Sequence, residues 1–95
     1  MAEEKNLENK IKTYLKSKGV WYIKIWGSMF TRNGIPDILC CINGKFVAIE
    51  VKSSIGKMSK LQEYEVEKVQ KSKGLFYCVR PQNFNEFKKE VENLL

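Results

Sequence analysis

The sequence predicts an α/β fold in which a mixed sheet is flanked by helices in the order αβββαβα. Segments with helical periodicity stand near both ends and in the middle, separated by four short runs of β-branched and aromatic residues. Asn43-Gly44 separates two of these runs, as in a tight hairpin, and a helical segment joins the last two, as between parallel strands. The 95 residues are expected to form a single domain, residues 1–95.

The N-terminal part is predicted to form a helix, a strand and a loop. The helix covers about residues 3–18, and Gly19 ends it. Its apolar face repeats at helical spacing and consists of Leu7, Ile11, Tyr14 and Leu15. Residues 20–26 form the first strand, and the turn-forming residues 27–34 lead from it into the hairpin.

The predicted hairpin comprises residues 37–42 and 45–51. A two-residue loop makes Ile42 face Lys45, and counting back along both strands puts Asp37 opposite Glu50. Because side chains alternate along a strand, Lys52 shares a face with these two carboxylates. The other face is apolar and is expected in the core: Ile38, Cys40, Ile42, Val47, Ile49 and Val51.

The C-terminal part is predicted to form a helix, a strand and a final helix. Ser59 and Gln62 have the spacing of a capping box, which opens a helix that runs to about residue 73 before Gly74. Residues 75–80 form a strand that stops at Pro81, and residues 85–95 form the last helix. The apolar contacts expected there are Phe84, Phe87, Val91, Leu94 and Leu95.

Asp37, Glu50 and Lys52 are the residues that point to chemistry. Like charges directly opposed in an antiparallel ladder repel, so two carboxylates there need a reason. Paired carboxylates are the usual ligands of Mg²⁺, and a lysine beside the ion can orient an attacking water or stabilise extra negative charge on phosphorus. The alternative is structural: Asp37 only begins a strand, and Glu50 and Lys52 form a solvated surface pair.

Composition limits the chemistry and suggests a partner. The sequence contains no histidine, which excludes His-Zn sites and Ser-His-Asp triads, so carboxylate, lysine and metal remain. Seventeen basic residues outnumber eleven acidic ones, which suits a polyanion such as DNA. The three cysteines are expected to be buried, inert thiols, because each lies in an apolar strand pattern. The polar start and the lack of long apolar runs predict an intracellular protein without a membrane segment.

The motif residues resemble a known family. Pro36-Asp37, followed after the hairpin by Glu50-Val51-Lys52, resembles the PD-(D/E)xK nuclease signature. The string Gly34-Ile35-Pro36-Asp37-Ile38, with Ile49-Glu50-Val51-Lys52, the Gly-Lys-Met-Ser loop and Gln62, resembles its VRR-NUC (virus-type replication-repair nuclease) branch. The resemblance implies a restriction-endonuclease-like core.

The resemblance also implies roles for individual residues. Asp37 and Glu50 would bind Mg²⁺ or Mn²⁺, the main-chain carbonyl of Val51 would complete the coordination, and Lys52 would assist the attacking water. Gln62 would position the lysine, the water or a phosphate, besides its role as a cap. Glu8 matches a first-helix glutamate that contributes to metal binding or supports it, and a pair with Lys12 is the structural alternative.

Phosphate contacts are expected from the loop before the hairpin and from the start of the second predicted helix. The candidates are Ser28, Thr31, Arg32, Lys57 and Lys60, with a solvated surface as the alternative for the lysines. Trp26 and Phe30 could stack on an exposed base, although aromatic residues at a strand end more often lie in the core or at a dimer contact.

These observations predict a metal-dependent, structure-selective DNA endonuclease with an activity like that of Holliday-junction resolvases. The resemblance implies branched DNA as partner, a homodimer, no small-molecule cofactor, and a viral or prophage source with action in the host cytoplasm. Trp21, Tyr22, Trp26 and Phe30 are candidates for the dimer contact. The alternatives are a flap or nicking repair nuclease, a non-catalytic DNA-binding module and a purely structural protein.

Overall fold

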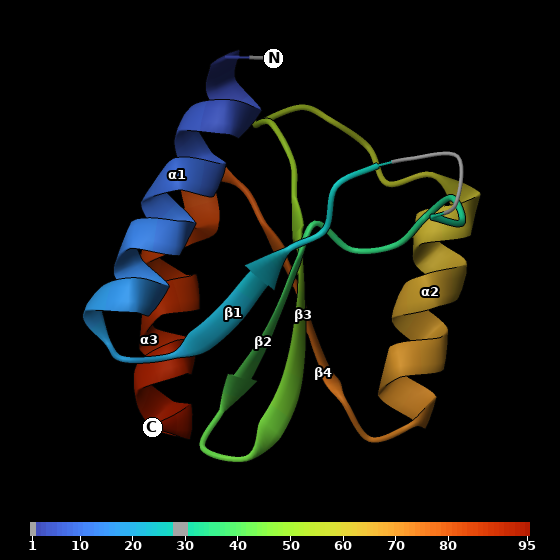
Figure 1. The fold of residues 1–95 in the computed structure, drawn as a ribbon. Helices are drawn as coiled ribbons and strands as arrows, with labels where there is room; N and C mark the ends of the chain where they lie inside the picture. Colours follow the sequence, from blue (N-terminus) through green and yellow to red (C-terminus); the bar gives the residue numbers. More distant parts are fainter. Residues whose placement is uncertain (1, 28–30) are drawn as a thin grey trace.

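A computed structural model of the chain describes residues 2–27 and 31–95 (Figure 1). The predicted order of helices and strands is confirmed, with one short 3₁₀ helix added before the last helix. The elements are α1 (Ala2–Ser17), β1 (Trp21–Lys24), β2 (Ile38–Ile42), β3 (Lys45–Val51), α2 (Lys60–Lys71), β4 (Leu75–Val79), η1 (Pro81–Asn83) and α3 (Phe84–Leu94). Among the described residues, no helix combines the length and the apolar character needed to cross a membrane.

The four strands form one mixed sheet in the order β1-β2-β3-β4. β1, β2 and β3 are antiparallel neighbours, and β4 runs parallel to β3 after the crossover through α2. The hairpin has the predicted register, with Ile42 facing Lys45 and Ile38 facing Ile49. Positive φ angles at Asn43 (51°) and Gly44 (81°) produce the tight turn that fixes this register.

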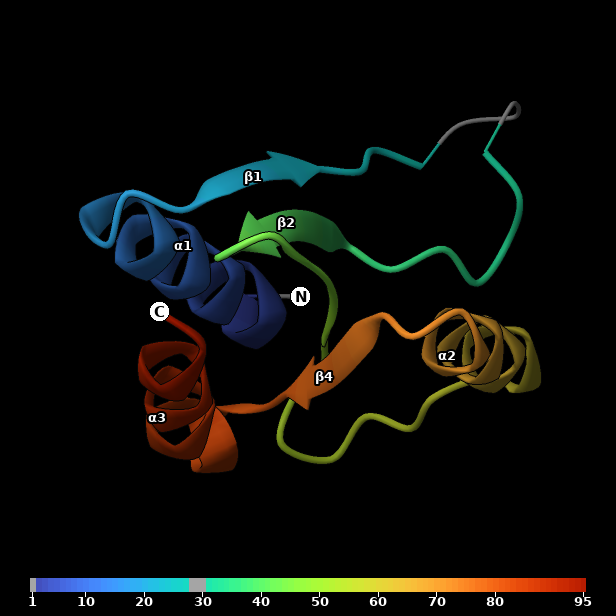
Figure 2. The same ribbon diagram turned by 90° about the horizontal axis from the view of Figure 1, so that it is seen from below.

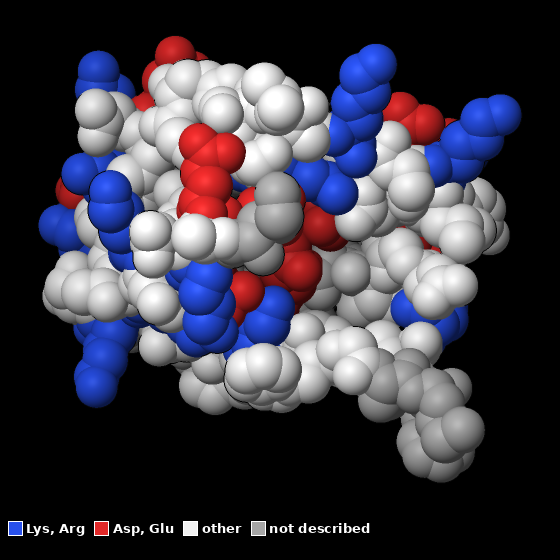
Figure 3. All heavy atoms as spheres, turned by 90° about the horizontal axis from the view of Figure 1, so that it is seen from above, with Lys and Arg blue, Asp and Glu red and all other residues white. Residues whose placement is uncertain are grey.

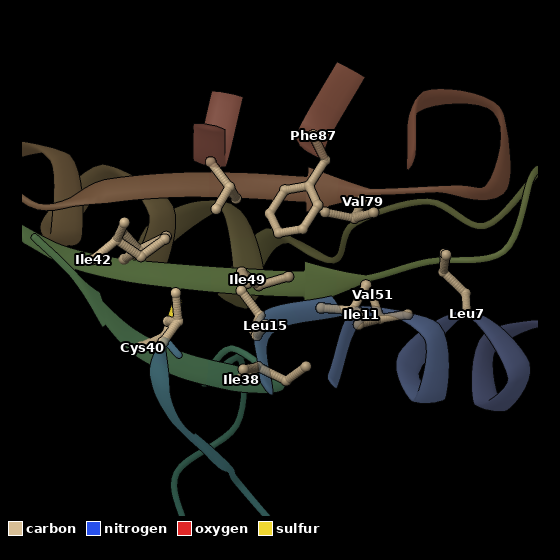
Figure 4. Close-up of a cluster of buried hydrophobic side chains, with 13 residues drawn as sticks. Leu7, Ile11, Leu15, Ile38, Cys40, Ile42, Ile49, Val51, Val79 and Phe87 are labelled. Atoms are coloured by element: carbon tan, nitrogen blue, oxygen red, sulfur yellow. The ribbon is translucent and has the colours of Figure 1, made fainter. Parts of the chain in front are cut away.

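The helices cover the two faces of the sheet unequally. α1 and α3 lie together on one face, and α2 lies alone on the other (Figures 1 and 2). The core forms under α1 and α3, where all six predicted inward-facing hairpin residues are buried. Figure 4 labels five of them, Ile38, Cys40, Ile42, Ile49 and Val51, gathered with Leu7, Ile11 and Leu15 of α1 and Phe87 of α3. The sheet face toward α2 is left partly uncovered.

That uncovered face corrects the prediction for the cysteines. Cys40 is buried and Cys78 is half-buried, but Cys41 is exposed. Cys41 alternates with Cys40 along β2 and therefore points to the α2 side, where it pairs with Trp21 of β1 and Phe46 of β3. Trp21 and Phe46 are also exposed, at 62% and 48%. An apolar strand pattern does not reveal which face a helix will cover.

Element ends also differ from the predictions. The first strand is shorter than residues 20–26, because Val20 is buried before it and Trp26 lies beyond it, 68% exposed. The second helix ends at Lys71, and the last one starts at Phe84 after Pro81 opens η1. Leu95, predicted as a core contact, is 51% exposed because it follows the final turn of α3.

Gly34 allows the loop before the hairpin to approach α2 closely. Its φ is +88°, and a Cβ at this position would lie 2.6 Å from the main-chain carbonyl carbon and oxygen of Leu61. Any side chain would therefore push the loop and α2 apart. This contact brings the first turn of α2 next to the residues that precede β2.

Candidate active site

Asp37 lies immediately before β2, beside the end of β3, as the register predicts. The main-chain N–H of Val51 donates to Asp37 Oδ2 at 2.7 Å, and the main-chain carbonyl of Asp37 accepts from the N–H of Ile25 at 2.8 Å. The end of β3 therefore holds the carboxylate of Asp37, and the residue after β1 holds its main chain. A pocket of about 250 Å³, lined by Ile25, Gly27, Arg32 and other residues of the preceding loop, reaches Asp37.

Glu50 is the buried member of the pair, with 3% of its surface exposed. Gln62 Nε2 donates to Glu50 Oε2 at 2.9 Å, and Lys52 Nζ lies 4.0 Å from the same oxygen. The other oxygen, Oε1, is buried and has no hydrogen-bond partner among the described residues. Burial, followed by the nearby charge of Asp37, raises the pKa of Glu50 to about 8, although Lys52 opposes this shift.

Gln62 forms the predicted capping box and also contacts Glu50. Its Oε1 accepts from the main-chain N–H of Ser59 at 2.8 Å, while Ser59 Oγ accepts from the N–H of Gln62 at 3.1 Å, so the capping box is complete. Because its oxygen is used in the cap, the amide must turn its nitrogen toward Glu50. The cap thereby orients a hydrogen-bond donor into the site.

The carboxylate pair fits a divalent cation. A buried carboxylate oxygen without a partner costs about 1–3 kcal/mol, and a cation would supply that partner and remove the repulsion from Asp37. Among the described residues, no group of three or more Asp, Glu, His or Cys side chains is placed to hold an ion. The side-chain ligands present are therefore Asp37 and Glu50, and other coordination positions would fall to main-chain oxygen or water.

Glu8 lies on α1 and is only 7% exposed, yet it faces lysines on several sides. Its Oε1 lies 2.8 Å from Lys24 Nζ, and its Oε2 lies 3.2 Å from Lys12 Nζ. Lys12 acts as a nearby charge, because Oε2 lacks a well-aligned hydrogen bond. Burial works to raise the pKa of Glu8, but the close ammonium groups of Lys24 and Lys12 outweigh it and lower the pKa.

Lys24 was not recognised from the sequence, although it links Glu8 to Asp37. Its Nζ also lies 3.7 Å from Asp37 Oδ1, and the side chain is 18% exposed. By its register with Ile38, Lys24 belongs to the sheet face that packs against α1. A lysine at an inward-facing strand position was the available signal, since such a charge needs a partner.

The loop after Lys52 depends on contacts that were also missed. Arg80 Nη1 donates to the carbonyls of Ser53 at 2.8 Å and Gly56 at 2.5 Å. Glu4 accepts from the N–H of Ser53 at 3.3 Å. The loop is thus tied to the end of β4 and to the start of α1, which limits the movement of Lys52.

The residues predicted to contact phosphate differ in exposure and in their bonding partners. Arg32 is 73% exposed but donates twice to the buried Glu65 on α2, both at 3.0 Å. Thr31 Oγ1 donates to the carbonyl of Trp26 at 3.4 Å. Lys57 and Lys60 are exposed, whereas Ser28 and Phe30 lie outside the described residues. Figure 3 shows acidic side chains recessed in a hollow of this face, with basic side chains around it.

We expect the metal-free protein to lose stability as the pH rises. Glu50 has a pKa of about 8 when folded and an ordinary value of 4.5, so the native state binds more protons than the unfolded state between these values. The free energy of unfolding should therefore fall across this window, by roughly a few kcal/mol. Urea unfolding in EDTA at several pH values measures this free energy.

Glu50→Gln should flatten the dependence of the free energy of unfolding on pH, whereas Glu63→Gln, at an exposed position, should not. Equal slopes in the wild type and both variants would contradict the assignment of this dependence to Glu50.

Comparison with known families gives a match over most of the chain. Residues 2–77 match the model of a family described as archaeal Holliday junction resolvase (hjc). A comparison with curated proteins gave no match. The matched family belongs to the PD-(D/E)xK superfamily and consists of divalent-metal-dependent nucleases, so the superfamily prediction is confirmed, and the VRR-NUC branch stays a prediction. The match covers most of the chain, which therefore belongs to the archaeal Holliday junction resolvase (Hjc) family, a family of structure-selective nucleases.

Proposed function

We propose that the chain hydrolyses phosphodiester bonds of branched DNA with Mg²⁺ or Mn²⁺ held by Asp37, Glu50 and the main-chain carbonyl of Val51. The observation that carries this proposal is the buried Glu50, whose Oε1 has no partner among the described residues and which lies beside a second carboxylate. A cation would stabilise this arrangement by giving Glu50 Oε1 a partner and by removing the repulsion between the carboxylates. Family membership supports divalent-metal dependence in general, and the carboxylate ligands favour a hard cation.

The ion and the surrounding side chains would have separate roles in catalysis. The bound ion would supply Lewis-acid stabilisation of charge on the phosphate. Lys52, held near Glu50, orients the attacking water and offers positive charge to the transition state. Gln62 holds Glu50 in place from α2. Glu8 supports the site through Lys24.

Binding of the DNA backbone is proposed for Lys57, Lys60 and Arg32. Lys57 precedes α2 and Lys60 begins it, and both are exposed, whereas Arg32 lines the pocket that reaches Asp37 and also binds Glu65. Thr31 lines the same pocket, and Ser28, outside the described residues, stays a proposed contact. The net charge of +6 favours this assignment, because phosphate contacts supply most sequence-independent affinity.

The proposal also covers the family branch, the extent of the domain and the place of action. The VRR-NUC branch rests on the Gly34-Ile35-Pro36-Asp37 and Ile49-Glu50-Val51-Lys52 strings. We propose that residues 1–95 act as one nuclease domain inside the cell, in the host cytoplasm if the source is viral. A monomeric flap or nicking nuclease is the competing activity, and a non-catalytic DNA-binding module is the competing class.

The direct test is cleavage of a labelled four-way junction, a 5′ flap and plain duplex with Mg²⁺, Mn²⁺ or EDTA. The wild type should cut the junction at paired, symmetric positions with either metal and should be inactive in EDTA. Asp37→Asn should reduce the rate on the order of 10²–10³-fold, because it removes one charged contact to the reacting centre. Glu86→Gln on α3 is the matched control and should cut normally.

Different products would decide between the alternatives. Cleavage of the flap in preference to the junction would favour the repair nuclease. Binding of all three DNAs without cleavage in either metal would reject the catalytic proposal and leave a binding module.

We also propose that the active form is a homodimer, because two symmetric cuts need two sites. The uncovered sheet face offers the contact. Trp21 and Ile23 of β1 are 62% and 40% exposed, and Phe46 of β3 is 48% exposed, all on the side of the sheet that α2 leaves open. Burying such aromatic surface is a typical source of dimer affinity.

Sedimentation at micromolar concentration tests the dimer. The wild type should sediment as a dimer, and Ile23→Lys should shift it to monomer and convert paired cuts into single nicks. The control is Leu95→Lys, which changes another exposed apolar residue, just after α3, and should leave the dimer intact. A wild-type monomer that still makes paired cuts would reject this proposal.

A further inference from the structure

One ammonium group is shared by two carboxylates at the edge of the site. Lys24 Nζ lies 2.8 Å from Glu8 Oε1 and 3.7 Å from Asp37 Oδ1. The Lys24 side chain is only 18% exposed, and its Nζ also lies 5.7 Å from the ring centroid of Trp26. Several contacts therefore hold this cation in one place.

The two glutamates of the site differ in how far nearby lysines neutralise their charges. Glu8 has lysine ammonium groups at 2.8 Å (Lys24), 3.2 Å (Lys12) and 3.8 Å (Lys5). Glu50 has one lysine, Lys52, at 4.0 Å, and one of its oxygens is buried without a partner. Glu8 is therefore already neutralised by the protein, whereas Glu50 is not.

We infer that Lys24 is a built-in cation that replaces a second divalent ion between Glu8 and Asp37, so that each chain takes one metal ion. This rests on the proposed function of Asp37 and Glu50. A divalent ion placed between Glu8 and Asp37 would meet the ammonium at close range and be repelled. Glu8 then acts as the partner that holds Lys24, and it does not coordinate metal.

Lys24 is a positioning residue in this arrangement. Asp37 has one oxygen, Oδ2, fixed by the N–H of Val51 and the other, Oδ1, facing Lys24. The ammonium therefore sets the orientation of the carboxylate without taking part in coordination. It also offsets the charge of Glu8, so that only the two charges of Asp37 and Glu50 are left for a divalent ion to balance.

Calorimetric titration of the metal-free protein with Mn²⁺, without DNA, tests the inference independently of turnover. The wild type should bind one ion per chain. Lys24→Met should bind two, because Glu8 and Asp37 are then left without their shared cation. Lys12→Met is the matched control, since it also removes a lysine from Glu8 but leaves Asp37 untouched, and it should bind one ion.

Two more variants keep the result interpretable. Lys24→Arg, which retains the cation, should bind one ion, and Lys24→Met combined with Glu8→Gln should return from two ions to one. Circular dichroism establishes that each variant is folded. Two ions in the wild type, or one ion in folded Lys24→Met, would overturn this inference alone. No Mn²⁺ binding by the wild type, or unchanged binding by Asp37→Asn, would overturn the proposed site and this inference with it.

Discussion

The opposition of Asp37 and Glu50 across the end of the hairpin is the constraint on which the rest of the structure depends. The tight turn at Asn43-Gly44 fixes the register, and the register leaves no freedom to separate the two carboxylates. Glu50 is buried as well, so its ionised form is disfavoured twice, by desolvation and by its neighbour. Without a cation, protonation of Glu50 removes both the cost of the buried charge and the repulsion from Asp37.

Several elements far apart in the sequence converge to hold that arrangement. α2 reaches the site through Gln62, and the absence of a side chain at Gly34 lets the preceding loop lie against the same helix turn. Arg80, at the end of β4, fixes the loop that follows Lys52. Each contact makes a modest contribution to the free energy of unfolding, about 1 kcal/mol for a typical hydrogen bond. Their joint effect is to leave the acidic pair little room to relax apart.

The sequence predicted those parts of the fold and site that depend on local patterns. Asn43-Gly44 specified the register, strand alternation placed the core residues, and the Ser59–Gln62 spacing specified the start of α2. Lys24 and Arg80 could not be predicted in the same way, because their partners lie at least 13 residues away and depend on how elements pack. The exposure of Cys41 likewise depends on which face α2 covers, a tertiary property that strand periodicity does not contain.

The proposed site requires that Asp37 and Glu50 hold a divalent ion. Anomalous diffraction from crystals soaked in Mn²⁺ tests this requirement, because the signal locates the ion without any assumption about activity. A peak is expected between the two carboxylates, with Glu50 Oε1 and the carbonyl of Val51 among its ligands. An empty site at saturating Mn²⁺, or a peak elsewhere with Glu50 still lacking a partner, would contradict it.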